Sequence, residues 1–128
     1  VMARGDIANT GSTSQRADRL ADGALSGSVR TVERWFDTSA FANPRAYTYG
    51  NAGRNILRRA GTKTLDFGLS KNFRLTERQT FQFRAEAFSI TNTPLFGAPG
   101  NTVGTTTLGR VTSAGGNRIL QFSLKYSF

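Results

Sequence analysis

The chain has 128 residues and a formal net charge of +9, from 17 Lys and Arg against 8 Asp and Glu. It contains no Cys and no His. These absences remove thiolate and disulfide chemistry, and with them the commonest general base and metal ligand. We therefore expect no enzyme activity, no cofactor and no metal site. No apolar run approaches the roughly 18 to 20 residues of a membrane-spanning helix.

Residues 1–61 are polar and irregular. So long a stretch without periodicity is improbable inside a compact soluble domain but ordinary in the external loops of a large β-barrel. We expect the end of a strand followed by a long extracellular loop. Trp35, Phe36 and Phe41 form its one apolar cluster, which predicts a short helical turn that pins the loop.

Two segments with apolar residues at every second position follow, at about 64–74 and 80–90, joined by a short polar turn at 75–79. Each is about as long as a tilted transmembrane β-strand needs to be. The first has one interruption on its apolar face, Lys71. The apolar faces consist of Leu65, Phe67, Leu69 and Phe73 in the first segment, and Phe81, Phe83, Ala85 and Ala87 in the second.

The turn length also predicts a hairpin register in which Arg74 faces Thr80 and Phe73 faces Phe81. Lys71 then lies beside Phe83. A lysine at the membrane midplane costs about 2 to 4 kcal/mol, and the cost falls towards zero near the interface. We therefore expect Lys71 either to extend its stem to the headgroups or to rest its ammonium on an aromatic ring.

Residues 91–117 are irregular again and predict a second extracellular loop, and a third strand follows at about 118–128. Its apolar residues alternate strictly with polar ones and end on Phe128. A soluble domain has little reason to end in this way, whereas the last strand of a transmembrane barrel must close the wall and face lipid. The alternating apolar residues are Leu120, Phe122, Leu124, Tyr126 and Phe128.

The unequal connections predict a direction across the membrane. Outer-membrane barrels have short periplasmic turns and long extracellular loops. The strand at 64–74 would then run inward, the strand at 80–90 outward and the strand at 118–128 inward. This arrangement brings four aromatic residues to the periplasmic interface as a girdle: Phe73, Phe81, Tyr126 and Phe128.

Three strands cannot close a barrel, because single-chain outer-membrane barrels begin at about eight. The fold class expected is therefore all-β: the C-terminal strands of a transmembrane antiparallel β-barrel, about three long strands with long extracellular loops. The missing strands, and any signal peptide, would lie upstream of residue 1.

Several segments resemble the C-terminal part of TonB-dependent outer-membrane receptors, and the Oar-like type most closely. The resemblance extends over nearly the whole chain. It is carried by the residues at 8–19, 34–41, 50–58, 65–73 and 83–88, and by the terminal Tyr126-Ser127-Phe128.

This resemblance implies a barrel of about 22 strands that imports a substrate across the outer membrane with energy from the inner-membrane TonB complex. The plug domain and the TonB box would lie upstream. Implied partners are outer-membrane lipid and lipopolysaccharide, the remaining strands, the plug, the TonB complex and the outer-membrane assembly machinery. The last strand resembles the signal that this machinery reads, carried by Phe122, Leu124, Tyr126 and Phe128.

The polar faces of the three strands would line the barrel lumen. Their side chains either contact the plug or a passing substrate, or bond to one another on a wetted wall. The lumen-facing candidates are Asp66, Asn72, Arg74, Gln82, Arg84, Glu86 and Lys125.

Three other functions compete with a transporter. A soluble β-rich module would bind a glycan or an anionic ligand through Trp35, Tyr47 and Tyr49. The charge of +9 would suit nucleic acid, but basic residues are scattered and no recognition helix is evident, so we expect no nucleic-acid partner. An enzyme would rest on Asp66 and Glu86, two carboxylates without a defined pocket.

Overall fold

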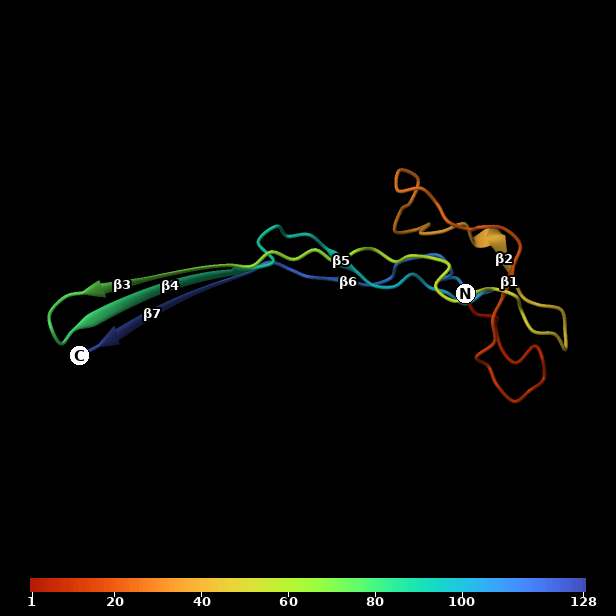
Figure 1. Ribbon diagram of the computed structural model, residues 1–128, viewed down its shortest axis with the longest axis horizontal. Coiled ribbons are helices and arrows are strands. Elements are labelled where there is room, and N and C mark those ends of the chain that lie inside the picture. The colour runs from red at the N-terminus through yellow and green to blue at the C-terminus, as the bar shows by residue number, and fades with distance from the viewer. The chain divides into compact units, whose positions relative to one another are not determined.

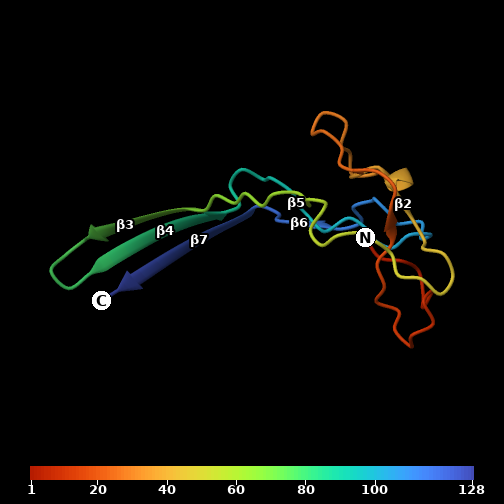
Figure 2. The same cartoon turned by 45° about the vertical axis from the view of Figure 1, so that its right-hand side comes forward.

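Three long strands form one sheet in the computed structural model, which describes residues 1–128. β3 spans Phe67–Arg74, β4 spans Thr80–Phe88 and β7 spans Ile119–Ser127. β4 lies between the other two and is antiparallel to both, as Figures 1 and 2 show. Each strand lies within one of the three intervals expected from the alternation of apolar residues. The fold is all-β and antiparallel, as expected.

The register of the β3–β4 hairpin is the one that the short turn predicts. Arg74 pairs with Thr80 and Phe73 with Phe81, and Lys71 lies opposite Phe83. Residues 75–79 form the turn, where the Leu75 N–H donates to the Gln79 carbonyl at 3.0 Å. This part of the sequence interpretation is confirmed.

Outside the sheet, the strands are only two residues long. β1 (Asp18–Arg19) pairs with β2 (Phe41–Ala42), and β5 (Leu95–Phe96) pairs with β6 (Ala114–Gly115). The single helical element is a 3₁₀ turn, η1, at Thr38–Ala40. Residues 1–66 and 89–118 therefore consist mainly of loops.

The loops gather into a compact unit of their own. Residues Val1–Ala60 and Phe96–Ala114 form this loop unit, and Gly61–Leu95 with Gly115–Phe128 form the sheet unit. Backbone hydrogen bonds join the two stretches of the loop unit. The Trp35 N–H donates to the Gly109 carbonyl at 2.7 Å. The alternation pattern gives no sign that the two loops fold together.

The core of the loop unit is built around two phenylalanines. Phe36 is 2% exposed and meets Phe41 edge to face, with ring centroids 5.7 Å apart. Ala17, Ala40 and Val103 complete the core, and Trp35 packs at its border. Asp37 caps η1 by accepting from the Ser39 N–H at 3.2 Å. The expected apolar cluster with a short helical turn is therefore present.

Gly50 marks a close approach of two backbone segments within the loop unit. A Cβ atom at this position would overlap the carbonyl groups of Arg16 and Ala17. Two residues later, the Ala52 N–H donates to the Ala17 carbonyl at 3.0 Å. Only glycine allows the two segments to come this close.

We predict that Gly50→Ala separates these segments and destabilises the loop unit by about 1 to 3 kcal/mol, as overpacking does elsewhere. Limited proteolysis of the purified full-length protein should show faster cleavage within residues 1–60. Gly61→Ala is the matched control, because a Cβ at Gly61 meets open space. Equal cleavage of the two variants would contradict this prediction.

Candidate functional site

The sheet unit has one apolar and one polar face. Side chains alternate along a strand, and the register sets apolar residues opposite apolar residues across all three strands. The apolar face consists of four rows: Phe67–Ala87–Leu120, Leu69–Ala85–Phe122, Lys71–Phe83–Leu124 and Phe73–Phe81–Tyr126. Lys71 is the only charged member.

The apolar face lies open in this sheet. The side chains of Phe122 and Leu124 are 68% and 65% exposed. So large a contiguous apolar surface marks contact with a membrane or another protein. A nine-residue strand is about 30 Å long and, tilted by about 40°, spans roughly 23 Å. This height is close to the apolar band of about 25 Å on outer-membrane barrels.

The four predicted girdle aromatics lie together at the end of the sheet that carries the 75–79 turn. Phe73, Phe81 and Tyr126 form one row, and the rings of Phe73 and Phe81 are 6.4 Å apart. Phe128 follows β7 and its ring lies 5.8 Å from that of Tyr126. Their level in the membrane remains a prediction.

Lys71 lies in the row next to these aromatics. No aromatic ring holds its ammonium, since the one cation–π contact in the structure joins Arg30 and Trp35. Extension of its stem towards the membrane interface is still a prediction.

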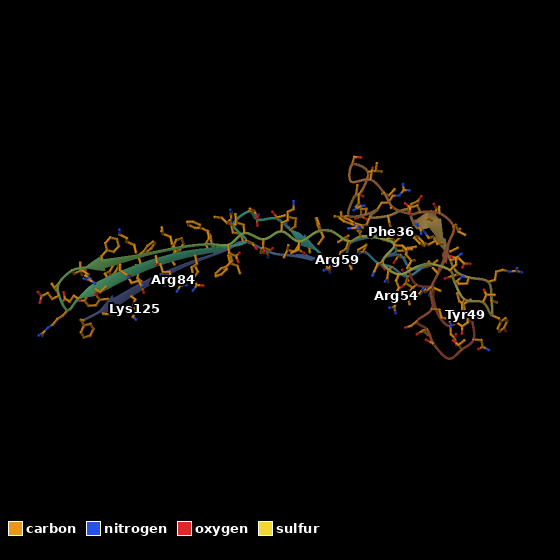
Figure 3. The ribbon with its side chains drawn as sticks, in the orientation of Figure 1. Phe36, Tyr49, Arg54, Arg59, Arg84 and Lys125 are labelled. Atoms are coloured by element: carbon orange, nitrogen blue, oxygen red, sulfur yellow. The ribbon has the colours of Figure 1, made fainter.

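The polar face carries the lumen-facing candidates. Its rows are Gly68–Glu86–Gln121, Ser70–Arg84–Ser123, Asn72–Gln82–Lys125 and Arg74–Thr80–Ser127. Six of the seven candidates occupy these rows, and Figure 3 shows the side chains of two of them, Arg84 and Lys125. That these side chains face the lumen is still a prediction.

One ion pair lies on the polar face. The Arg84 Nη2 atom is 2.5 Å from the Glu86 Oε1 atom, two residues along the same strand. Glu86 lies opposite Gly68, which has no side chain. An open recess of about 240 Å³ lies here, lined in part by Gly68, Arg84 and Glu86. This ion pair is an example of the bonding between polar side chains that we expect on a water-exposed barrel wall.

Asp66, the seventh candidate, lies just before β3, and its carboxylate binds a backbone N–H group. Its Oδ1 atom accepts from the Ser89 N–H at 2.8 Å, beyond the end of β4. Asp66 and Glu86 therefore have different partners.

Sequence reasoning missed an apolar pair on the polar face. Phe88 lies opposite Ile119 at the loop end of β4 and β7, and their side chains are 41% and 59% exposed. Phe88 has an even number, like the polar-face residues of β4, and Ile119 has an odd number, like those of β7. The alternation along each strand would therefore have placed both residues on this face. The polar face thus ends in one apolar pair of residues on the loop side.

A buried amide organises the first part of the loop unit. Gln15 is 5% exposed, and its Nε2 atom donates to the Asp6 carboxylate at 2.5 Å and to the Thr10 hydroxyl at 3.1 Å. The Thr10 backbone N–H donates to the same carboxylate and lowers the pKa of Asp6. Likewise, the Ser39 hydroxyl lowers the pKa of Asp37.

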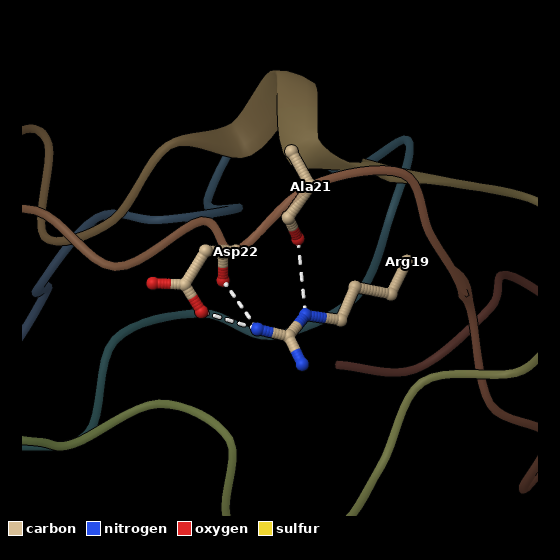
Figure 4. A network of polar contacts seen from close by, with 3 residues as sticks. All are labelled: Arg19, Ala21 and Asp22. Atoms are coloured by element: carbon tan, nitrogen blue, oxygen red, sulfur yellow. Dashed lines mark hydrogen bonds and ion pairs between the residues drawn. The ribbon is translucent and has the colours of Figure 1, made fainter.

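Surface ion pairs add to this framework. Arg19 contacts the Asp22 carboxylate and donates from Nε to the Ala21 carbonyl at 3.0 Å (Figure 4). Arg110 pairs with Glu33. Exposed pairs such as these contribute about 0 to 1 kcal/mol each. They therefore add little to the stability of the loop unit.

The three aromatics of the soluble-module hypothesis have different settings. Trp35 is half-buried, and its indole N–H donates to the Arg58 carbonyl at 2.8 Å. Tyr47 and Tyr49 are 77% and 74% exposed. Tyr49 lines an open polar recess of about 450 Å³ together with Arg16. Trp35 is therefore committed to loop packing, whereas the two tyrosines are free.

Comparison with known families decides the class. The model of a family described as an outer membrane beta barrel domain matches residues 1–121. The chain belongs to this family. No curated protein and no solved structure matches it. The protein resides in the bacterial outer membrane.

Membership in the outer membrane beta barrel family explains the two faces. In such barrels, each strand shows apolar residues to lipid and polar residues to the interior. Because barrels of this kind need about eight strands or more, the three strands form part of a wall. The free edges of β3 and β7 must pair with further strands, since lipid offers no hydrogen bonds.

No helix in the structure is long and apolar enough to cross a bilayer. The structure gathers no group of three or more acidic, His or Cys side chains suited to a metal ion.

We predict that Phe122→Lys, on the apolar face near the centre of β7, destabilises the barrel by about 2 to 4 kcal/mol, because it places an ammonium in lipid. The heat-modifiable folded band of the full-length protein in outer membranes should weaken. Gln121→Lys is the matched control, since its side chain lies on the polar face opposite Glu86. If both lysine variants assemble equally well, the assignment of the faces is wrong.

Proposed function

We propose that the chain is the C-terminal barrel segment of a TonB-dependent outer-membrane receptor of the Oar-like type. In this role it closes part of the wall of a transporter that imports a substrate with energy from the TonB complex. The observation that carries the proposal is the loop unit, which has its own buried core around Phe36 and Phe41. An ordered loop assembly of this size suits a receptor that captures a substrate before transport.

Unpaired cations on the polar face favour a barrel with a wide interior. Arg74 and Lys125 have no carboxylate within 4.0 Å, and neither side chain makes a hydrogen bond in the sheet. Unpaired cations need water or an acidic partner. An eight-stranded barrel is filled by its own side chains, whereas a barrel of about 22 strands encloses a plugged lumen. A plug domain would supply partners for these cations.

The other functions receive less support. A soluble β-rich module does not agree with membership in an outer-membrane barrel family. We propose that the protein is not an enzyme, because Asp66 bonds to the Ser89 backbone and Glu86 pairs with Arg84 in the sheet. We also propose that it has no nucleic-acid partner, because its basic residues are scattered along the chain.

The assembly role is assigned to the apolar residues of the last strand, Phe122, Leu124, Tyr126 and Phe128. We predict that Phe128→Ala combined with Tyr126→Ala lowers the amount of folded barrel in the outer membrane. The heat-modifiable band on gels measures the amount of folded barrel. Ser127→Ala, between them on the polar side, is the control. An unchanged folded fraction in the double variant would remove this assignment.

The energised role is tested on the full-length receptor, including the sequence upstream of residue 1. We predict that the purified receptor binds the isolated periplasmic domain of TonB in calorimetry, and that deletion of an upstream TonB box abolishes this binding. Absence of binding by the intact receptor would contradict the TonB-dependent class. It would leave membership in the outer-membrane barrel family unaffected.

A further inference from the structure

A small cavity in the loop unit is bounded by two arginines and a tryptophan. Its volume is about 140 Å³. This volume is several times a water molecule's share of liquid volume, about 30 Å³, so the cavity has room for a small acidic group. Apart from the two arginines, the lining residues are apolar or aromatic. They are Ala24, Leu25, Arg30, Trp35, Phe36, Ile56, Leu57 and Arg58.

Arg30 presents an unused donor here. Its Nη2 atom donates to the Leu25 carbonyl at 2.7 Å, and its guanidinium carbon lies 5.3 Å from the centroid of the Trp35 ring. Its Nε atom is buried and has no hydrogen-bond partner in the protein. The buried Nε atom lies out of reach of a molecule in the cavity, whereas the Nη1 atom is not buried and makes no hydrogen bond, so Nη1 is the donor free to bind an oxygen ligand.

The surrounding groups are held in place. The Trp35 indole N–H donates to the Arg58 carbonyl at 2.8 Å, which ties the ring under Arg30 to the segment that carries Arg58. This bond fixes the ring of Trp35 and the backbone of Arg58, while the Arg58 guanidinium keeps the freedom to turn towards the cavity. A fixed ring and backbone lower the entropic cost of binding.

The cations at this place are not neutralised by the protein. No carboxylate lies within 4.0 Å of Arg30, Arg58 or Arg59. Arginine presents its N–H groups in a fork that matches the oxygens of a carboxylate or a phosphate. Two such side chains beside one largely apolar cavity therefore suit an anionic ligand.

A second, larger cavity shares part of the wall. Its volume is about 470 Å³, which lies in the range of small-molecule sites. Phe36, Ile56, Leu57 and Arg58 line both cavities, and Arg59 lines the larger one. The apolar side chains would contact the body of a ligand whose acidic group reaches Arg30.

We propose that this pocket of the loop unit binds an amphiphilic anion, with a carboxylate or phosphate against Arg30 and Arg58 and an apolar body along Phe36, Ile56 and Leu57. Binding here requires the folded loop unit and does not depend on the TonB complex. The site deepens the proposed receptor function by naming a substrate class.

The test is calorimetry on the full-length barrel in nanodiscs of neutral lipid, with three probes: phenyl phosphate, 4-phenylbutyrate and the uncharged 4-phenylbutanol. We expect one or both anions to bind, and the alcohol to bind at least about 10-fold more weakly. Arg30→Gln and Arg58→Gln should each weaken anion binding by about 10-fold or more. Binding of only phenyl phosphate or only 4-phenylbutyrate identifies the head group.

Arg45→Gln is the matched control, because Arg45 is exposed, has no carboxylate partner and lines none of these cavities. Arg58 is also exposed, so its variant keeps the test valid if Arg30→Gln disturbs Trp35. Equal binding of the alcohol, no binding of either anion, or equal losses in Arg45→Gln and Arg58→Gln would overturn the proposal. Any of these results leaves the TonB binding test unaffected.

Discussion

A slip of one residue between β4 and β7 would turn Phe122 to the polar face and Ser123 to the apolar face, because side chains alternate along a strand. In the observed register, most apolar residues of all three strands lie on one face and most polar residues on the other. This register places Ala85 between Leu69 and Phe122, so a small residue of the middle strand lies between two large ones. Lipid contact, the aromatic row and the polar wall all depend on this alignment.

The same backbone hydrogen bonds that align the faces also leave two edges without partners. A lipid-exposed strand edge costs several kcal/mol for each unsatisfied group, so β3 and β7 require neighbours in the membrane. The loop unit obeys a different constraint. It buries Phe36 and Phe41 in a core of its own, and its backbone segments approach closely at Gly50. Wall and loops thus gain stability from different sources.

The strands and the hairpin register were predictable from sequence, because a period of two and a short turn leave few alternatives. The loop unit was not predictable, since the bond from Val103 to Met2 joins distant residues without any periodic signal. On the polar face, parity placed Arg84 and Glu86 correctly, but it could not reveal that Asp66 bonds to the Ser89 backbone. The pocket at Arg30 depends on tertiary packing alone.

The most direct measurement scans β7 with single cysteines, at positions 119–127 of a cysteine-free full-length protein in lipid bilayers. Each cysteine is tested with a water-soluble thiol reagent and with a fluorescent label whose emission is quenched by spin-labelled lipid. We predict lipid quenching at Leu120, Phe122, Leu124 and Tyr126, and aqueous reaction at the residues between them. Uniform accessibility along β7, or quenching without a period of two, would contradict this prediction.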